Sequence, residues 1–178
     1  MKAFKIFILS SICMVACMSC STKPEVEPMD KLIERGLQTA VEQSLIMAKE
    51  LEPQDSLLPR TYENGKLKTV KYHSWISGFF PGVLWQLYEY NQDEQFRKYA
   101  ELFTSRVEPA KKMTSTHDLG FGQGYRLTGN KQYVEVIKEG THSLLTRWNP
   151  HLKVMQSWGK NERWQFPVII DNMMNLEM

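Results

Sequence analysis

Two kinds of helical segment alternate along the chain from residue 75 onward. Segments of the first kind are apolar on nearly every side, as in residues 83–90, which indicates inner helices that are buried all round. Segments of the second kind carry one apolar stripe and one charged face, as in residues 93–107, which is typical of an outer helix with one wet side. The expected order alternates inner and outer helices that start, in turn, near Trp75, Asp93, Asp118, Lys131 and Asp171.

The spacing of the inner segments predicts how the helices are arranged. Trp75, Asp118 and Asp171 are 43 and 53 residues apart, and each interval fits one helix, a turn, a returning helix and a loop. Such hairpins form either a closed ring or an open solenoid. Solenoid repeats of the tetratricopeptide type are about 34 residues long with tight turns, so the longer intervals favour the ring. We therefore expect an all-α fold built as a ring of helical hairpins.

Asp118 and Asp171 each stand where a loop is expected to become an apolar helix. The start of a helix presents unpaired amide donors and a positive dipole end, so an acid there commonly serves only as an N-cap. In a ring, however, both acids and Trp75 would face the same mouth. This pairing favours a shared site over two separate caps.

Charge composition excludes one class of function. The 178 residues include 22 Lys and Arg and 20 Asp and Glu, giving a net charge of +2, and no basic stripe is present. We therefore expect no nucleic-acid partner. The length permits one domain with a substantial core.

The N-terminus carries a targeting signal. A short basic start is followed by an apolar run, and the three cysteines, Cys13, Cys17 and Cys20, all precede residue 21. We expect residues 1–20 to be a signal peptide of the bacterial lipoprotein type, and residues 21–29 to be a polar tether. Cys20 is favoured as the lipid-carrying residue because the tether follows it directly; Cys17 and plain cleavage stay open as alternatives. The protein would then cross the inner membrane and be periplasmic or a membrane-anchored lipoprotein.

Other local patterns predict the remaining elements. A helical stripe covers residues 30–51, Asn64-Gly65 is the favoured centre of a hairpin turn, and residues 154–158 form a short strand in a loop with two tryptophans. The last apolar segment is still running at Met178. We therefore interpret residues 30–178 as the N-terminal part of an incomplete domain.

Five motifs, in this order, resemble glycoside hydrolase family 88, the unsaturated glucuronyl hydrolases. The motifs occupy residues 74–85, 116–121, 124–130, 156–158 and 169–176. The resemblance runs from about Leu32 to Met178 and implies the N-terminal part of an (α/α)6 barrel. It also implies a glycoside hydrolase without a cofactor or metal, whose partner is an unsaturated uronic-acid oligosaccharide of the glycosaminoglycan type left by a polysaccharide lyase.

The resemblance also assigns roles to residues. The unsaturated sugar is an enol ether, and protonation at carbon 4 followed by addition of water at carbon 5 releases the next sugar. Asp171 would be the general acid and then the base that activates water, while Asp118 would hold ring hydroxyls and stabilise positive charge. Trp75, His117 and Trp158 match substrate contacts of the family.

One segment of the chain departs from the pattern of the family. Only Gly122 and Gln123 separate Phe121 from Gly124, where the family usually has about two more helical turns, so we expect a short inner helix there.

Two alternative functions stay open. One is unsaturated rhamnogalacturonyl hydrolase, which shares the barrel; the other is a helical lipoprotein that binds glycans without cleaving them.

Overall fold

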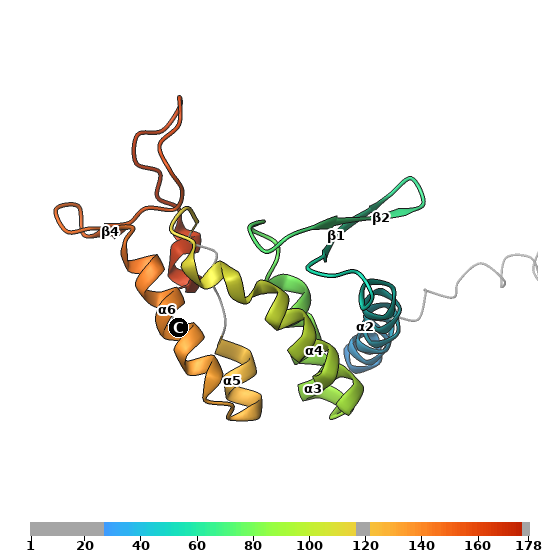
Figure 1. Cartoon of the computed structure of the whole chain (residues 1–178). Helices are drawn as coiled ribbons and strands as arrows, with labels where there is room; N and C mark the ends of the chain where they lie inside the picture. The colour runs from blue at the N-terminus through green and yellow to red at the C-terminus, as the bar shows by residue number, and fades with distance from the viewer. Residues whose placement is uncertain (1–26, 117–121, 176–178) are drawn as a thin grey trace, which may run out of the picture. The chain divides into compact units, whose positions relative to one another are not determined.

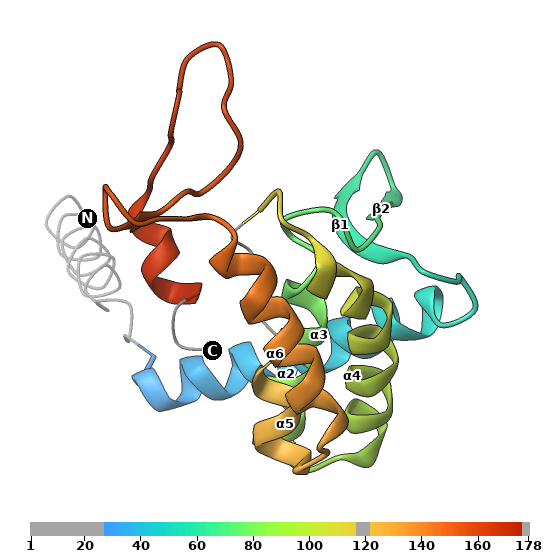
Figure 2. The ribbon, with the colours of Figure 1, turned by 60° about the vertical axis from the view of Figure 1, so that its left-hand side comes forward.

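A computed structural model describes residues 27–116 and 122–175 (Figures 1 and 2). The chain divides into two compact units, residues 1–37 and 38–178, and α2 begins in the first and ends in the second. The strands form two separate two-stranded sheets, β1–β2 and β3–β4. In chain order the elements are α2 (Met29–Leu51), β1 (Leu58–Glu63), β2 (Lys66–Val70), α3 (Phe79–Asn91), α4 (Glu94–Val107), the 3-10 helix η1 (Glu108–Lys112), α5 (Gly122–Thr128), α6 (Gln132–Leu145), β3 (Trp148–Asn149), β4 (Val154–Met155) and the 3-10 helix η2 (Ile170–Asn175).

The helix predicted over residues 30–51 is confirmed as α2. In the first unit, Arg35 pairs with Glu27 at 2.8 Å. Asp30 lies inside the first turn of the helix rather than before it. In the second unit, the buried residues of α2 are Ser44, Ala48 and Leu51, near its C-terminus.

The hairpin of α3 and α4 forms the centre of the core. Phe80 meets Phe103 edge to face with ring centroids 4.9 Å apart, and the buried Trp85 donates its indole N–H to Thr104 Oγ1 at 3.0 Å. Asp93 caps α4, because its side chain accepts from the backbone N–H of Gln95 at 2.8 Å. This bond satisfies one of the amide donors left open at the helix start.

One prediction about α3 is wrong for this chain. The helix was expected to be buried on every side, yet Phe79 is 63% exposed, and Val83 and Tyr90 are also exposed. Its buried residues are Phe80, Pro81, Leu84, Trp85 and Leu87. The described helices that pack on α3 are α4 and α5, so neighbours cover one side of the helix and the other faces solvent.

The second hairpin, α5 and α6, packs against α3 through a close approach at Gly124. A Cβ at this position would lie 3.1 Å from the Tyr133 ring and 3.3 Å from Trp85. Glycine usually weakens a helix, but here its missing side chain lets α5 approach its neighbours. Across the α3–α5 pair, Arg126 donates to Glu89 at 2.8 Å and 2.5 Å, and these hydrogen bonds hold the pKa of Glu89 below its ordinary value.

The inner helix predicted from Asp118 is described only from Gly122 onward. The described helix is the seven-residue α5, which begins at Gly122. Asp118 and His117 lie outside the described residues.

The predicted β-hairpin is confirmed. Asn64 and Gly65 both have positive φ, 51° and 71°, which is the backbone of a type I′ turn and matches the twist of the strands it joins. Strands β1 and β2 are antiparallel, with Glu63 opposite Lys66 at the turn.

Arg106 on α4 holds the end of α2 and the chain that follows it. The side chain is 9% exposed. Nη1 donates to the carbonyls of Leu51 at 3.0 Å and Leu57 at 2.9 Å, and Nη2 donates to the carbonyl of Glu52 at 2.9 Å. Its guanidinium also lies over the Phe103 ring, 4.4 Å from the centroid. One buried cation therefore joins α2, the connection to β1, and the core.

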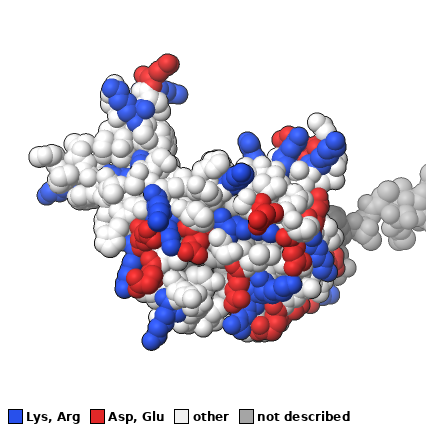
Figure 3. Space-filling model, viewed as in Figure 1, with Lys and Arg blue, Asp and Glu red and all other residues white. Residues whose placement is uncertain are grey.

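Acidic and basic side chains are interspersed on the face of the molecule shown in Figure 3. Within the described part of the chain, no helix combines the length and apolar character needed to cross a membrane.

Candidate active site

The segment of residues 155–158, which we call the central segment, connects the parts of the chain that flank the two predicted acids. It begins at the end of β4, which pairs with β3, and it carries Trp158. Thr116 forms an isolated antiparallel bridge with Trp158. The backbone immediately before His117 and Asp118 therefore lies beside Trp158.

The other flank of the site is joined to the same segment through Ser157. This serine is 0% exposed. Its Oγ donates to Asn172 Oδ1 at 2.9 Å and accepts from the backbone N–H of Ile169 at 3.0 Å. Its own N–H donates to the carbonyl of Pro167 at 2.9 Å. The chain before Asp171 is thus bonded to the central segment through both backbone and side chain.

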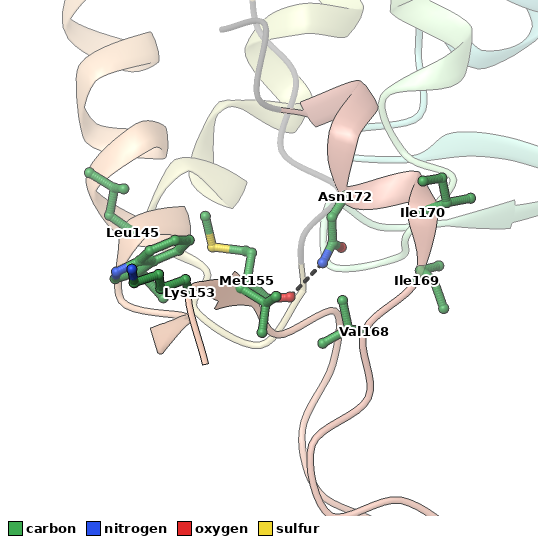
Figure 4. A pocket seen from close by; sticks show the side chains of 9 residues that line it. Leu145, Lys153, Met155, Val168, Ile169, Ile170 and Asn172 are labelled. Atoms are coloured by element: carbon green, nitrogen blue, oxygen red, sulfur yellow. Dashed lines mark hydrogen bonds between the residues drawn. The ribbon is translucent and has the colours of Figure 1, made fainter. Parts of the chain in front are cut away.

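Asn172 completes this connection. The side chain is 6% exposed, and Nδ2 donates to the carbonyl of Met155 at 2.6 Å, as Figure 4 shows. Both functional atoms of the amide are therefore used, one toward Ser157 and one toward Met155. Because buried polar groups are costly when unpaired, this pairing fixes the orientation of Asn172.

Asp171 immediately precedes this anchored residue and is exposed. The sequence predicted that Asp171 opens an apolar α-helix, but the structure places it in the first turn of η2, a six-residue 3-10 helix. That prediction of element type is wrong. A 3-10 helix has three residues per turn, so neighbouring side chains point in different directions. The buried Asn172 side chain therefore leaves its neighbour directed away from this interior contact.

The Arg147 side chain connects the chain at Thr114 to the central segment. The side chain is 8% exposed. Nε donates to the carbonyl of Gln156 at 2.7 Å, and Nη1 donates to the carbonyl of Thr114. Nη2 is buried without a hydrogen-bond partner among the described residues. Burial lowers the pKa of Arg147, but a guanidinium remains charged in proteins, so a buried cation links the chain before Thr116 to the chain before Trp158.

Trp75 lies in the turn before α3 and is 66% exposed. Its ring meets Phe79 edge to face at 6.0 Å. The turn is held by Ser77, whose Oγ donates to the carbonyl of Tyr72 at 2.9 Å. An exposed aromatic face on a braced turn suits stacking against a sugar, and its placement beside the two acids stays a prediction.

Sequence reasoning missed Arg147, Ser157 and Asn172 as organisers of this site. Ser157 and Asn172 lie inside motifs singled out from the sequence, but beside Trp158 and Asp171 they carried no separate chemical signal. Arg147 follows an amphipathic helix, and an arginine in such a position is normally exposed to solvent. Their roles depend on partners distant in sequence.

An apolar pocket of about 610 Å³ lies next to Asn172 (Figure 4). Its lining includes Leu145, Trp148, Val154, Met155, Val168, Ile169 and Ile170. Sugar hydroxyls need hydrogen-bonding groups, which this lining barely offers, and Asp171 does not line the pocket. We therefore place the candidate site at the central segment and not in this cavity.

Within the described ranges, no group of three or more His, Cys, Asp or Glu side chains is arranged to hold a metal ion.

Known proteins resemble both the sequence and the fold. An unsaturated glucuronyl hydrolase of Formosa agariphila is 43% identical over 112 residues, which cover 58% of this chain and 28% of the relative. An unsaturated chondroitin disaccharide hydrolase of Streptococcus pneumoniae is 28% identical over 169 residues, covering 88% of this chain and 40% of the relative. A crystal structure of an unsaturated glucuronyl hydrolase specific for heparin matches with a TM-score of 0.69 and 33% identity, over 79% of this chain and 40% of that one. No family model matches the chain.

These similarities, together with the two helical hairpins, place the chain in the class of (α/α)6-barrel proteins, of which it covers part. The predicted fold class is thereby confirmed. More specifically, the chain is a partial member of glycoside hydrolase family 88, the unsaturated glucuronyl hydrolases. It spans between 28% and 40% of the length of the three relatives described above.

Proposed function

We propose that this chain contributes to an unsaturated glucuronyl hydrolase that removes the 4,5-unsaturated uronic acid from lyase-generated oligosaccharides of the glycosaminoglycan type. The names of the relatives support this substrate class, since one is an unsaturated chondroitin disaccharide hydrolase and another a glucuronyl hydrolase specific for heparin.

The observation that carries the proposal is the convergence of both acid-bearing stretches on the central segment. The bridge between Thr116 and Trp158 holds one stretch, and the bonds of Asn172 to Ser157 and Met155 hold the other. Asp171 next to one of these anchors and Trp158 next to the other suit a reaction in which a sugar acquires positive charge, because aromatic faces attract cations.

In the proposed reaction, Asp171 in its protonated form delivers a proton to carbon 4 of the enol ether. Positive charge is then shared between the ring oxygen and carbon 5, and Asp118 stabilises this charge. Asp171, now a carboxylate, removes a proton from water as the water oxygen bonds to carbon 5. The resulting hemiketal opens and releases the next sugar, so one water molecule is consumed and Asp171 is regenerated. Trp75, His117 and Trp158 are proposed to hold the sugar.

A spectroscopic assay tests this proposal. The full chain is incubated with an unsaturated chondroitin disaccharide, and the ultraviolet absorbance of the conjugated enol ether is followed. We expect the absorbance to fall as hydration destroys the double bond. A parallel reaction with an unsaturated rhamnogalacturonan disaccharide separates the two enzyme alternatives. Saturable binding of either sugar, by tryptophan fluorescence, without loss of absorbance would support the non-catalytic glycan-binding function instead.

We also propose that the protein crosses the inner membrane and is held at the membrane by a lipid on Cys20, with residues 21–29 as the tether. The polar run directly after Cys20 supports this assignment. Expression in bacteria fed a labelled fatty acid should label the wild-type protein and not Cys20→Ser. Label retained in Cys20→Ser but lost in Cys17→Ser would move the attachment site to Cys17, and an unlabelled wild type would leave plain cleavage.

A further inference from the structure

Ser157 and Asn172 form a side-chain pair that the proposed chemistry does not use. Both are almost fully buried, at 0% and 6% exposure, whereas Asp171 is exposed. A pair of this kind stabilises the fold wherever it occurs. What distinguishes this pair is its position, since Asn172 is the residue next to the proposed proton donor and Ser157 is the residue next to Trp158.

The bonds of the pair fix Asp171 from both directions along the chain. On the N-terminal side, the N–H of Ile169 donates to Ser157 Oγ at 3.0 Å, and Pro167 accepts from Ser157 N–H at 2.9 Å. On the C-terminal side, Asn172 accepts from Ser157 Oγ at 2.9 Å and donates to Met155 at 2.6 Å. Residues 170 and 171 therefore lie between two anchor points that are both attached to the central segment.

The geometry of η2 makes this anchoring effective for the neighbouring side chain. Asn172 N–H donates to the carbonyl of Ile169 at 3.2 Å, so one tight turn spans the two anchors. In such a turn, the direction of one side chain sets the directions of its neighbours because only backbone torsions separate them. A shift of Asn172 would move the Asp171 carboxyl with it.

We infer that Ser157 and Asn172 are positioning residues that hold Asp171 in register with Trp158 for proton delivery to the sugar. This inference rests on the proposed function. The pair touches neither substrate nor reacting atoms, and its contribution comes through the placement of the carboxyl. A misplacement of about 1 Å can cost roughly 100-fold in rate, so weakening the pair should affect the chemical step more than binding.

The test compares four variants of the full chain with the wild type: Ser157→Ala, Asn172→Ala, the double variant and the control Ser143→Ala. Ser143 is also a buried serine, at 9% exposure, and its Oγ donates to the carbonyl of Lys111 at 2.5 Å. Ser143→Ala therefore removes one buried hydrogen bond on α6, outside the central segment, whereas Ser157→Ala removes the two described above. Turnover of the unsaturated disaccharide gives kcat and KM, and urea unfolding gives the stability of each variant.

We expect Ser157→Ala and Asn172→Ala each to lower kcat by about tenfold or more, with KM within about threefold of wild type. The kcat of the double variant should be no lower than that of the more impaired single variant, because the two side chains act as one unit. Ser143→Ala should keep both constants although it loses a buried hydrogen bond. If the alanine variants do not fold, Ser157→Cys keeps the volume with a much weaker hydrogen-bonding group and should show the same loss of kcat.

The inference is overturned if folded Ser157→Ala or Ser157→Cys behaves as Ser143→Ala does. Losses confined to KM, or losses that multiply in the double variant, overturn it as well. Wild-type activity separates this result from failure of the proposed function. A wild-type chain that does not turn over the sugar removes the proposed function, and the positioning role falls with it.

Discussion

Asp171→Asn is expected to lower kcat by about 10²- to 10⁴-fold, the usual contribution of a positioned general acid or base. Asparagine keeps the shape of the side chain but cannot deliver a proton to carbon 4 or accept one from water. Because Asp171 is exposed and its neighbour Asn172 carries the buried contacts, the substitution should leave folding intact. Sugar binding, measured by tryptophan fluorescence, should stay close to that of the wild type.

Asp93→Asn is the matched control for this experiment. Asp93 is also an acid at a helix start, where its side chain accepts from Gln95 N–H at 2.8 Å, and asparagine is an equally good N-cap. Its kcat should equal that of the wild type. Near-normal turnover of Asp171→Asn would show that another residue donates the proton.

Arg106→Met is expected to destabilise the fold by about 3 kcal/mol. The substitution keeps much of the apolar stem over the Phe103 ring but removes the three hydrogen bonds to the carbonyls of Leu51, Glu52 and Leu57. Those carbonyls lose a charged donor, which costs more than the loss of a neutral one. Relief of the buried charge offsets part of the loss. Urea unfolding followed by circular dichroism measures the change.

Arg97→Met on the same helix provides the comparison. Arg97 is 41% exposed and pairs with Glu94 at 3.5 Å and Glu101 at 3.2 Å. Exposed pairs of this kind contribute about 0–1 kcal/mol, so Arg97→Met should barely move the unfolding midpoint. Equal midpoints for the two variants would mean that the end of α2 is held by contacts other than those of Arg106.

Features that depend on neighbouring residues were predictable from the sequence. The cap at Asp93 and the turn at Asn64-Gly65 follow from side-chain size and backbone torsions within a few positions, and both are present. The amphipathic pattern of residues 93–107 likewise predicted α4 to its last residue. Local chemistry decides each of these elements.

Features that depend on distant partners were not predictable in the same way. An apolar segment indicates burial but does not show which elements cover it. The exposure of Phe79 and Val83 on α3 therefore could not be predicted from the sequence. The pattern around Asp171 fitted an α-helix, whereas the bonds to Ser157 and Met155 hold this stretch in a 3-10 turn. The pairing of Ser157 with Asn172 spans 15 positions, and no local signal reports it.

The hydrogen bonds around the central segment also divide the residues that form them into those that tolerate substitution and those that do not. Thr114, Met155, Gln156 and Pro167 take part through main-chain carbonyls, which every amino acid possesses. Arg147, Ser157 and Asn172 take part through side-chain atoms that few others can replace. In a library of random variants, Thr114 and Gln156 should accept many substitutions that preserve the backbone path, while the buried Met155 and Pro167 should accept mainly apolar ones. The second group should accept only residues with matching donors and acceptors.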